Sequence, residues 1–95
     1  MTILRSGAIQ EKLKQVNGWK LAGEEIIREF SFPDFVTALR FVNAVGQKSE
    51  AAGHHPDIDI RYNRVKLALT SHDAGGLTAR DFELAAVIDD ISSKF

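Results

Sequence analysis

The sequence predicts an α+β fold, in which a four-stranded antiparallel sheet carries its helices on one face in the order α-β-β-α-β-β-α. Three observations support this prediction. The spacing of apolar residues alternates along the chain between the period of a helix and the period of a strand. Both pairs of strand segments are joined by a turn so short that the strands must pair antiparallel. Each helical segment has one broad apolar face, which a single side of a sheet can bury.

The first helix and the first hairpin are predicted between residues 6 and 32. Ser6 is suited to cap a helix over residues 7–15, where apolar residues recur every three or four positions. A short strand over residues 19–21 and a tight turn lead to a second strand over residues 25–32. Apolar residues stand at alternate positions of the second strand, as expected when one of its faces is buried.

A long helix is predicted over residues 33–52. Pro33 fits the first turn, where its missing N–H has no partner to lose, and Asp34 favours the positive end of the helix dipole. Gly53 is a typical C-terminal cap. The apolar residues of this helix form one wide stripe, which consists of Phe35, Ala38, Leu39, Phe41, Val42 and Val45.

The second hairpin is predicted after Pro56, where the apolar period changes from that of a helix to that of a strand. Apolar and polar residues alternate over residues 57–62 and again over residues 65–70. Asn63-Arg64 between them is a plausible two-residue turn. The two segments therefore form the third and fourth strands of the sheet.

A loop over residues 71–76 leads to the final helix, which Thr78 and Asp81 begin as a near capping box. The apolar face of this helix, continued by Phe95, is wider than one small sheet can cover. We therefore expect the excess to be buried in a homodimer or a homotetramer. The apolar residues within the helix are Phe82, Leu84, Ala85, Val87, Ile88 and Ile91.

The composition restricts the function classes. We expect one domain over residues 1–95, because this length is ordinary for a single domain. The chain has no cysteine, which excludes disulfides and zinc–thiolate sites. The net charge is −1 and the basic residues are scattered, so we expect no direct binding of nucleic acid. No segment is apolar enough for a signal peptide or a membrane span, and we expect a cytoplasmic protein.

The three histidines of the chain lie at the ends of the second hairpin. His54 and His55 precede its first strand, and His72 follows its second strand. In an antiparallel hairpin these segments meet at one end of the sheet. Imidazole accepts and releases protons near neutral pH, so the cluster is suited to acid–base chemistry. The alternative is that each histidine only makes a hydrogen bond at a strand end. We expect no metal site, since the spacing lacks an HxH or i, i+4 pair.

The same histidines lie within longer motifs. These are EAAGHHPD at residues 50–57, YNRV at 62–65, and TSHDAGGLTARD at 70–81, with GW at 18–19 and FSFPDF at 30–35. Together they resemble the pterin-4a-carbinolamine dehydratase family. The resemblance implies the fold predicted above and a lyase without metal or cofactor. Such a lyase removes water from 4a-hydroxytetrahydropterin to give quinonoid dihydropterin, and so recycles the cofactor of aromatic amino acid hydroxylases.

The resemblance also implies roles for individual residues. His54 and His72 would carry the proton transfers, and His55 would hold the pterin and assist. Other residues of the motifs would bind the substrate or orient an imidazole. They are Glu50, Pro56, Asp57, Ser71 and Asp81. Trp19 could stack on a pterin or lie in the core or an interface.

Two other functions remain open from the sequence. Animal members of the family also serve as dimerisation cofactors for a homeodomain transcription factor, so this chain could be a non-catalytic interaction module. Its partner could then be an aromatic amino acid hydroxylase or another helix-bearing protein. The chain could also bind pterins without turnover. The complete set of histidines favours the dehydratase, because a pure adaptor does not need them.

Overall fold

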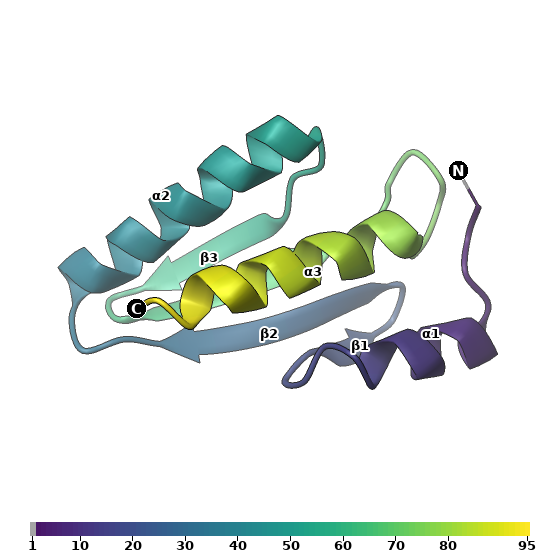
Figure 1. The fold of residues 1–95 in the computed structure, drawn as a ribbon, viewed down its shortest axis with the longest axis horizontal. Coiled ribbons are helices and arrows are strands. Elements are labelled where there is room, and N and C mark those ends of the chain that lie inside the picture. Colours follow the sequence, from purple (N-terminus) through teal and green to yellow (C-terminus); the bar gives the residue numbers. More distant parts are fainter. Residues whose placement is uncertain (1) are drawn as a thin grey trace.

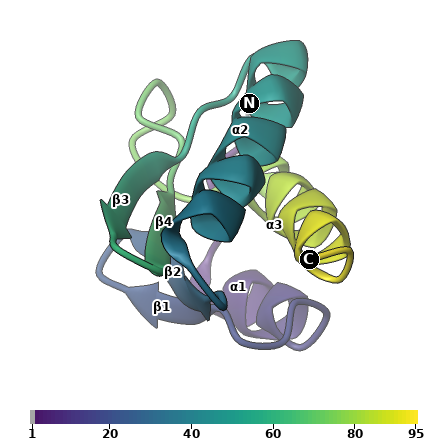
Figure 2. The ribbon, with the colours of Figure 1, turned by 90° about the vertical axis from the view of Figure 1, so that its left-hand side faces the viewer.

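The computed structural model describes residues 2–95 and confirms the predicted fold class (Figure 1). The four strands are antiparallel, and they lie in the order β1-β2-β4-β3. The helices cover one face of this sheet and leave the other face open (Figure 2). The elements are α1 (Ser6–Leu13), β1 (Lys20–Ala22), β2 (Glu25–Ser31), α2 (Phe35–Ala52), β3 (Asp57–Arg61), β4 (Arg64–Leu69) and α3 (Ala79–Ser92).

Helix α2 begins and ends at residues with clear capping roles. Asp34 is its N-cap, and the Asp34 carboxylate accepts a hydrogen bond from the backbone N–H of Thr37 at 2.8 Å. The side-chain contact with Thr37 is the main cause that lowers the pKa of the Asp34 carboxyl. We had predicted Pro33 in the first turn of the helix. It precedes the N-cap instead, so this prediction is wrong. Gly53 ends the helix with a left-handed φ of 63°, as predicted.

The turn of the second hairpin lies one residue earlier than the sequence predicted. Arg61 pairs with Arg64, so the turn consists of Tyr62 and Asn63, and Tyr62 adopts a positive φ of 52°. Contacts between Asn63 and Phe32, a residue outside the hairpin, fix this register. Its side-chain amide donates to the carbonyl of Phe32 at 2.8 Å, and the backbone N–H of Phe32 donates to the Asn63 carbonyl at 2.9 Å. A contact with the end of β2 thus outweighs the local turn preference.

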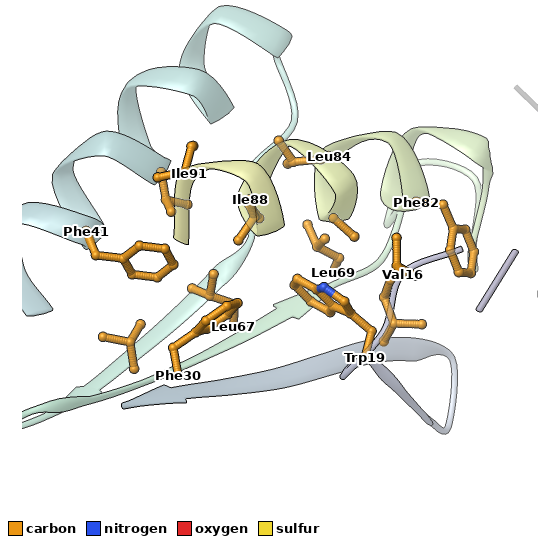
Figure 3. Close-up of a cluster of buried hydrophobic side chains, with 14 of the residues drawn as sticks. Val16, Trp19, Phe30, Phe41, Leu67, Leu69, Phe82, Leu84, Ile88 and Ile91 are labelled. Carbon is orange, nitrogen blue, oxygen red and sulfur yellow. The ribbon is translucent and has the colours of Figure 1, made fainter. Parts of the chain in front are cut away.

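Helix α3 lies over the centre of the sheet and closes the core (Figure 3). Ile88 and Ile91 are buried within the chain, so for these two residues the prediction of an uncovered apolar face is wrong. Val87 and Phe95 of the same predicted face are 40% and 44% exposed, so burial of this remainder in an assembly stays a prediction. Phe95 packs edge-on against Phe32 and Phe41. Most of the other exposed apolar side chains lie at the start of α2 and at the edge strand β3 with its turn. They include Phe35, Val36, Leu39, Ile58 and Tyr62.

Trp19 belongs to the core and joins α3 to the sheet. Its indole N–H donates to Asp89 Oδ1 at 2.8 Å, and Arg28 Nη1 donates to the same oxygen at 2.6 Å. Trp19 is only 5% exposed, so the ring is not available to stack on a ligand. Gly18 passes so close to Arg28 that an added Cβ would lie 2.9 Å from the guanidinium Nε, and its φ is 90°. Glycine is therefore required at this position.

No helix within residues 2–95 has both the length and the apolar character needed to cross a membrane.

Ser49 on the buried face of α2 offers a test of the packing. Its hydroxyl is the one buried side-chain polar atom without a hydrogen-bond partner among residues 2–95. We predict that Ser49→Ala raises the free energy of unfolding by about 1 kcal/mol, because an unpaired buried hydroxyl costs desolvation free energy. Urea unfolding measures the change. Ser93→Ala at the exposed end of α3 is the control, with an effect within about 0.5 kcal/mol. A loss of stability in Ser49→Ala would contradict the packing described here.

Candidate active site

The strand register brings the two histidine-bearing segments to the same end of the sheet, as the sequence predicted. Asp57, the first residue of β3, pairs with Ala68 near the end of β4. His54 and His55 precede this pair on one side, and His72 follows β4 on the other. The backbone prediction is therefore confirmed, and the question becomes where each imidazole points.

His54 points into the fold and contacts the carboxylate of Asp81. The distance from His54 Nε2 to Asp81 Oδ1 is 2.5 Å. His54 is 7% exposed and Asp81 is fully buried. Both Asp81 oxygens are occupied, because Oδ2 accepts from the hydroxyl of Ser71 and from the backbone N–H of Thr78, each at 2.9 Å. The carboxylate that caps α3 thus also holds the imidazole, in agreement with the predicted capping box.

The other ring nitrogen of His54 has a partner as well. Arg80 Nη2 lies 3.3 Å from His54 Nδ1 and donates to the carbonyl of Gly53 at 3.0 Å. Arg80 Nη1 lies 3.7 Å from Asp73 Oδ2. Both nitrogens of His54 are therefore held by residues at the start of α3, and neither faces solvent freely.

His55 points away from the fold and pairs with Glu50 one helical turn earlier. The distance from His55 Nε2 to Glu50 Oε1 is 2.7 Å. The two side chains are 63% and 81% exposed, so the pair lies at the surface. Such an exposed pair contributes little to stability, and it leaves the imidazole accessible to a ligand.

His72 is exposed and lines a recess of about 370 Å³. The floor and rim come from the loop after β4 and from the turn between β1 and β2. The Thr70 hydroxyl donates to the carbonyl of Glu24 at 2.7 Å, which ties these two segments together. Ser71 and Gly76 close the base of the loop as a β-bridge. The other residues around the recess are Ala22, Glu24, Glu25, Thr70, Gly75 and Gly76.

The predicted site residues thus fall into three groups. His54, Ser71 and Asp81 share one buried network, His55 pairs with Glu50 at the surface, and His72 lies in its own recess. Within residues 2–95, no hydrogen bond joins one imidazole to another. A single cavity shared by all three rings therefore stays a prediction. Pro56 is half-buried between the groups, and Asp57 is exposed at the start of β3.

No group of three or more histidine, aspartate or glutamate side chains within residues 2–95 is arranged to hold a metal ion. The chemistry that this end of the sheet offers is hydrogen bonding and proton transfer by imidazole and carboxylate.

Sequence reasoning missed three residues at this site. Arg80 contacts His54, while Glu24 and Glu25 border the recess of His72. An arginine in the first turn of a helix carries no motif of its own, and only the packing of α3 against Gly53 brings it to the imidazole. The glutamates belong to a turn that is remote from the histidines in sequence.

Comparison with known proteins gives a consistent result. A family model described as pterin 4 alpha carbinolamine dehydratase matches residues 2–91. A protein of Acidobacterium capsulatum, named provisionally as a pterin-4-alpha-carbinolamine dehydratase, is 61% identical over 89 residues, which cover 94% of this chain and 97% of the relative. A protein of Chloroflexus aurantiacus with the same provisional name is 57% identical over 91 residues, which cover 96% and 98%.

Two solved structures have the same architecture. The crystal structure of a transcriptional coactivator/pterin dehydratase from Brucella melitensis superposes with a TM-score of 0.92 at 32% identity, over 96% of this chain and 99% of that one. A pterin dehydratase-like protein identified as a RuBisCO assembly factor in the alpha-carboxysome superposes with a TM-score of 0.69 at 23% identity, over 80% and 90%. The second likeness concerns the fold alone.

The two histidine–carboxylate pairs differ in burial, and this difference is testable. We predict that Asp81→Ala lowers the free energy of unfolding by about 3 kcal/mol, because three buried donors lose their acceptor. The matched variant Glu50→Ala removes the exposed pair and should cost less than about 1 kcal/mol. Urea unfolding of both variants measures the difference. Equal losses would contradict the anchoring role of Asp81.

Proposed function

The chain belongs to the pterin 4 alpha carbinolamine dehydratase family, and we propose that it is a lyase that removes water from a 4a-hydroxytetrahydropterin. The match of the family model over residues 2–91 carries this proposal. The convergence of the two histidine-bearing segments at one end of the sheet supports it. No covalent intermediate is required, since the substrate already contains both the leaving hydroxyl and the adjacent N–H.

The reaction consists of two proton movements and one bond cleavage. The C4a–O bond breaks as a proton reaches the departing hydroxyl, which leaves as water. The proton on N5 is lost, and the electrons of that N–H bond complete the C4a=N5 double bond of the quinonoid dihydropterin. A positioned acid–base group contributes roughly 10²–10⁴-fold to such a step.

The exposure of the imidazoles divides these roles. His55 and His72 are both accessible, whereas His54 has a partner on each ring nitrogen. We therefore assign the proton transfers to His72 and His55 as a pair, and we assign His54 to the support of the site. The family resemblance had implied a proton transfer by His54. Glu50 orients His55, and Ser71 and Asp81 act through His54 instead of touching the pterin.

The physiological setting follows from the chemistry of the substrate. A reaction that hydroxylates with a tetrahydropterin must supply the carbinolamine, and a reductase must consume the dihydropterin. An aromatic amino acid hydroxylase is the partner enzyme that the family resemblance implies. We retain the predicted cytoplasmic location as part of this proposal, because such a pathway requires a common pool of reduced pterin.

We also propose that the protein is a homodimer or a homotetramer, with an interface that includes the exposed apolar residues of α2 and β3. Val36 and Leu39 of α2 and Ile58 of β3 are exposed apolar residues. A shallow groove of about 710 Å³ lies between these two elements. β3 is also an edge strand, so its outer backbone groups are open to pairing. A second copy of the chain can cover both the groove and the edge strand. If the chain is instead a non-catalytic interaction module, a partner protein would bind this same surface.

A turnover assay tests the proposed activity. We expect the purified protein to accelerate the loss of freshly prepared 4a-hydroxytetrahydropterin above the spontaneous rate. His72→Ala should lower kcat by roughly 10²-fold or more, because an acid–base group is lost. Its unfolding curve should not change, since the side chain is exposed. Lys94→Ala, at the other end of α3, is the control with normal turnover. A folded wild-type protein that gives no acceleration would refute the proposal.

Light scattering tests the assembly. We expect a mass of two or four times the 10.5 kDa of one chain at micromolar concentration. Val36→Lys should shift the mass towards the monomer, because a lysine cannot be buried in an apolar interface without a partner. Leu21→Lys, an exposed apolar position on β1, should leave the mass unchanged. A monomeric wild-type protein would contradict the assembly.

A further inference from the structure

We propose that Ile3 is a positioning residue for His72. Among residues 2–95, Ile3 is not one of those that line the recess of His72. Its side chain instead lies against two glycines of the loop that carries this imidazole. Ile3 therefore acts on the site through the backbone of the loop, and not by contact with a ligand.

The second half of this loop consists of residues that cannot pack by themselves. Gly75 and Gly76 have no side chains, and glycine loses more conformational freedom on ordering than any other residue. Gly75 also adopts a left-handed φ of 81°, which suits glycine. The order of this half of the loop therefore depends strongly on its neighbours.

Hydrogen bonds close the loop, but they converge on one acceptor. The carbonyl of Ser71 accepts from the backbone N–H groups of Ala74, Gly75 and Gly76, at 3.0, 3.0 and 3.3 Å. A carbonyl oxygen has two lone pairs, so three donors cannot each have a full bond. These bonds set the shape of the loop, and packing on its outer side is a separate contribution.

Ile3 supplies this packing. A Cβ added to Gly76 would lie 3.5 Å from Ile3 Cγ2, and one added to Gly75 would lie 3.9 Å from Ile3 Cδ1. Both are ordinary van der Waals distances between carbon atoms. The isoleucine side chain thus lies beside both glycines, on the side where other residues carry a side chain. Ile3 is 48% exposed, so about half of its surface is covered.

The residue after Ile3 anchors it in this place. The backbone N–H of Leu4 donates to the carbonyl of Leu77 at 2.8 Å. The Leu4 side chain is half-buried against the core, and Leu77 is buried. The segment before α1 is therefore joined to the chain directly after the loop, and this bond holds Ile3 beside the two glycines.

The glycines that Ile3 covers belong to the wall of the recess. Gly75 and Gly76 line it together with His72. A shift of the loop would move the imidazole relative to a bound substrate, and displacements of about 1 Å lower the rate of a reaction strongly. The effect on turnover rests on the proposed dehydratase function, whereas the effect on the loop does not.

Amide hydrogen exchange tests the packing without any substrate. In Ile3→Ser, the amides of Gly75 and Gly76 should exchange about five- to tenfold faster, because an apolar side chain no longer covers the loop. The amide of Gly53, which caps α2, should keep its rate. Ile3→Val keeps a branched apolar side chain and should behave as the wild type. Leu21→Ser, at an apolar residue that is 41% exposed, is the matched control without effect on these amides.

Two results would overturn the proposal. Unchanged exchange at Gly75 and Gly76 in Ile3→Ser would show that the bonds to Ser71 hold the loop without Ile3. An equal acceleration at Gly53 would show that Ile3 stabilises the fold as a whole and not this loop.

Kinetics and imidazole NMR test the effect on His72. We expect Ile3→Ser to lower kcat by roughly tenfold, because the proton carrier is displaced, whereas Ile3→Val and Leu21→Ser should be as active as the wild type. The ring signals of His72 should shift or broaden, and those of His55, which is also exposed, should not. A normal kcat or unchanged His72 signals in Ile3→Ser would refute the positioning role. An inactive wild type would refute the proposed function and leave the exchange and NMR results to decide the effect on the loop.

Discussion

The buried carboxylate of Asp81 is the constraint around which one end of this molecule is organised. A buried carboxylate must be surrounded by hydrogen-bond donors, and Asp81 takes them from three different segments of the chain. Ser71 lies in the loop after β4, Thr78 is the N-cap of α3, and His54 belongs to the segment after α2. The residue that caps α3 thus also fixes the position of a histidine-bearing segment.

This arrangement separates three histidines that look equivalent in the sequence. The network consumes both nitrogens of His54, whereas His55 and His72 remain accessible on either side of the same strand ends. Under the proposed dehydratase function, one buried imidazole with fixed partners and two exposed imidazoles would meet opposite requirements. Support needs a fixed geometry, and proton exchange needs access to the substrate and to solvent.

Much of the fold could be predicted from local patterns. Apolar periodicity located all helices and strands, Gly53 and Asp81 marked helix ends correctly, and the antiparallel hairpin placed the histidine segments together. The errors arose where tertiary contacts outweigh local preference. The Asn63 side chain donates to the carbonyl of Phe32, and the hairpin turn lies one residue earlier than predicted. The packing of α3 on the sheet buries Ile88 and Ile91. The directions of the imidazoles and the contact of Arg80 depend on packing between segments, which no local pattern encodes.

The position of a bound pterin tests this account most directly. A crystal structure with a dihydropterin, the product class of the proposed reaction, should show the ring within hydrogen-bond distance of His72 or His55. His54 should remain between Asp81 and Arg80, as it is in the free protein. A pterin bonded to a ring nitrogen of His54, with the contact to Asp81 or to Arg80 broken, would contradict the separation of the buried imidazole from the proton carriers.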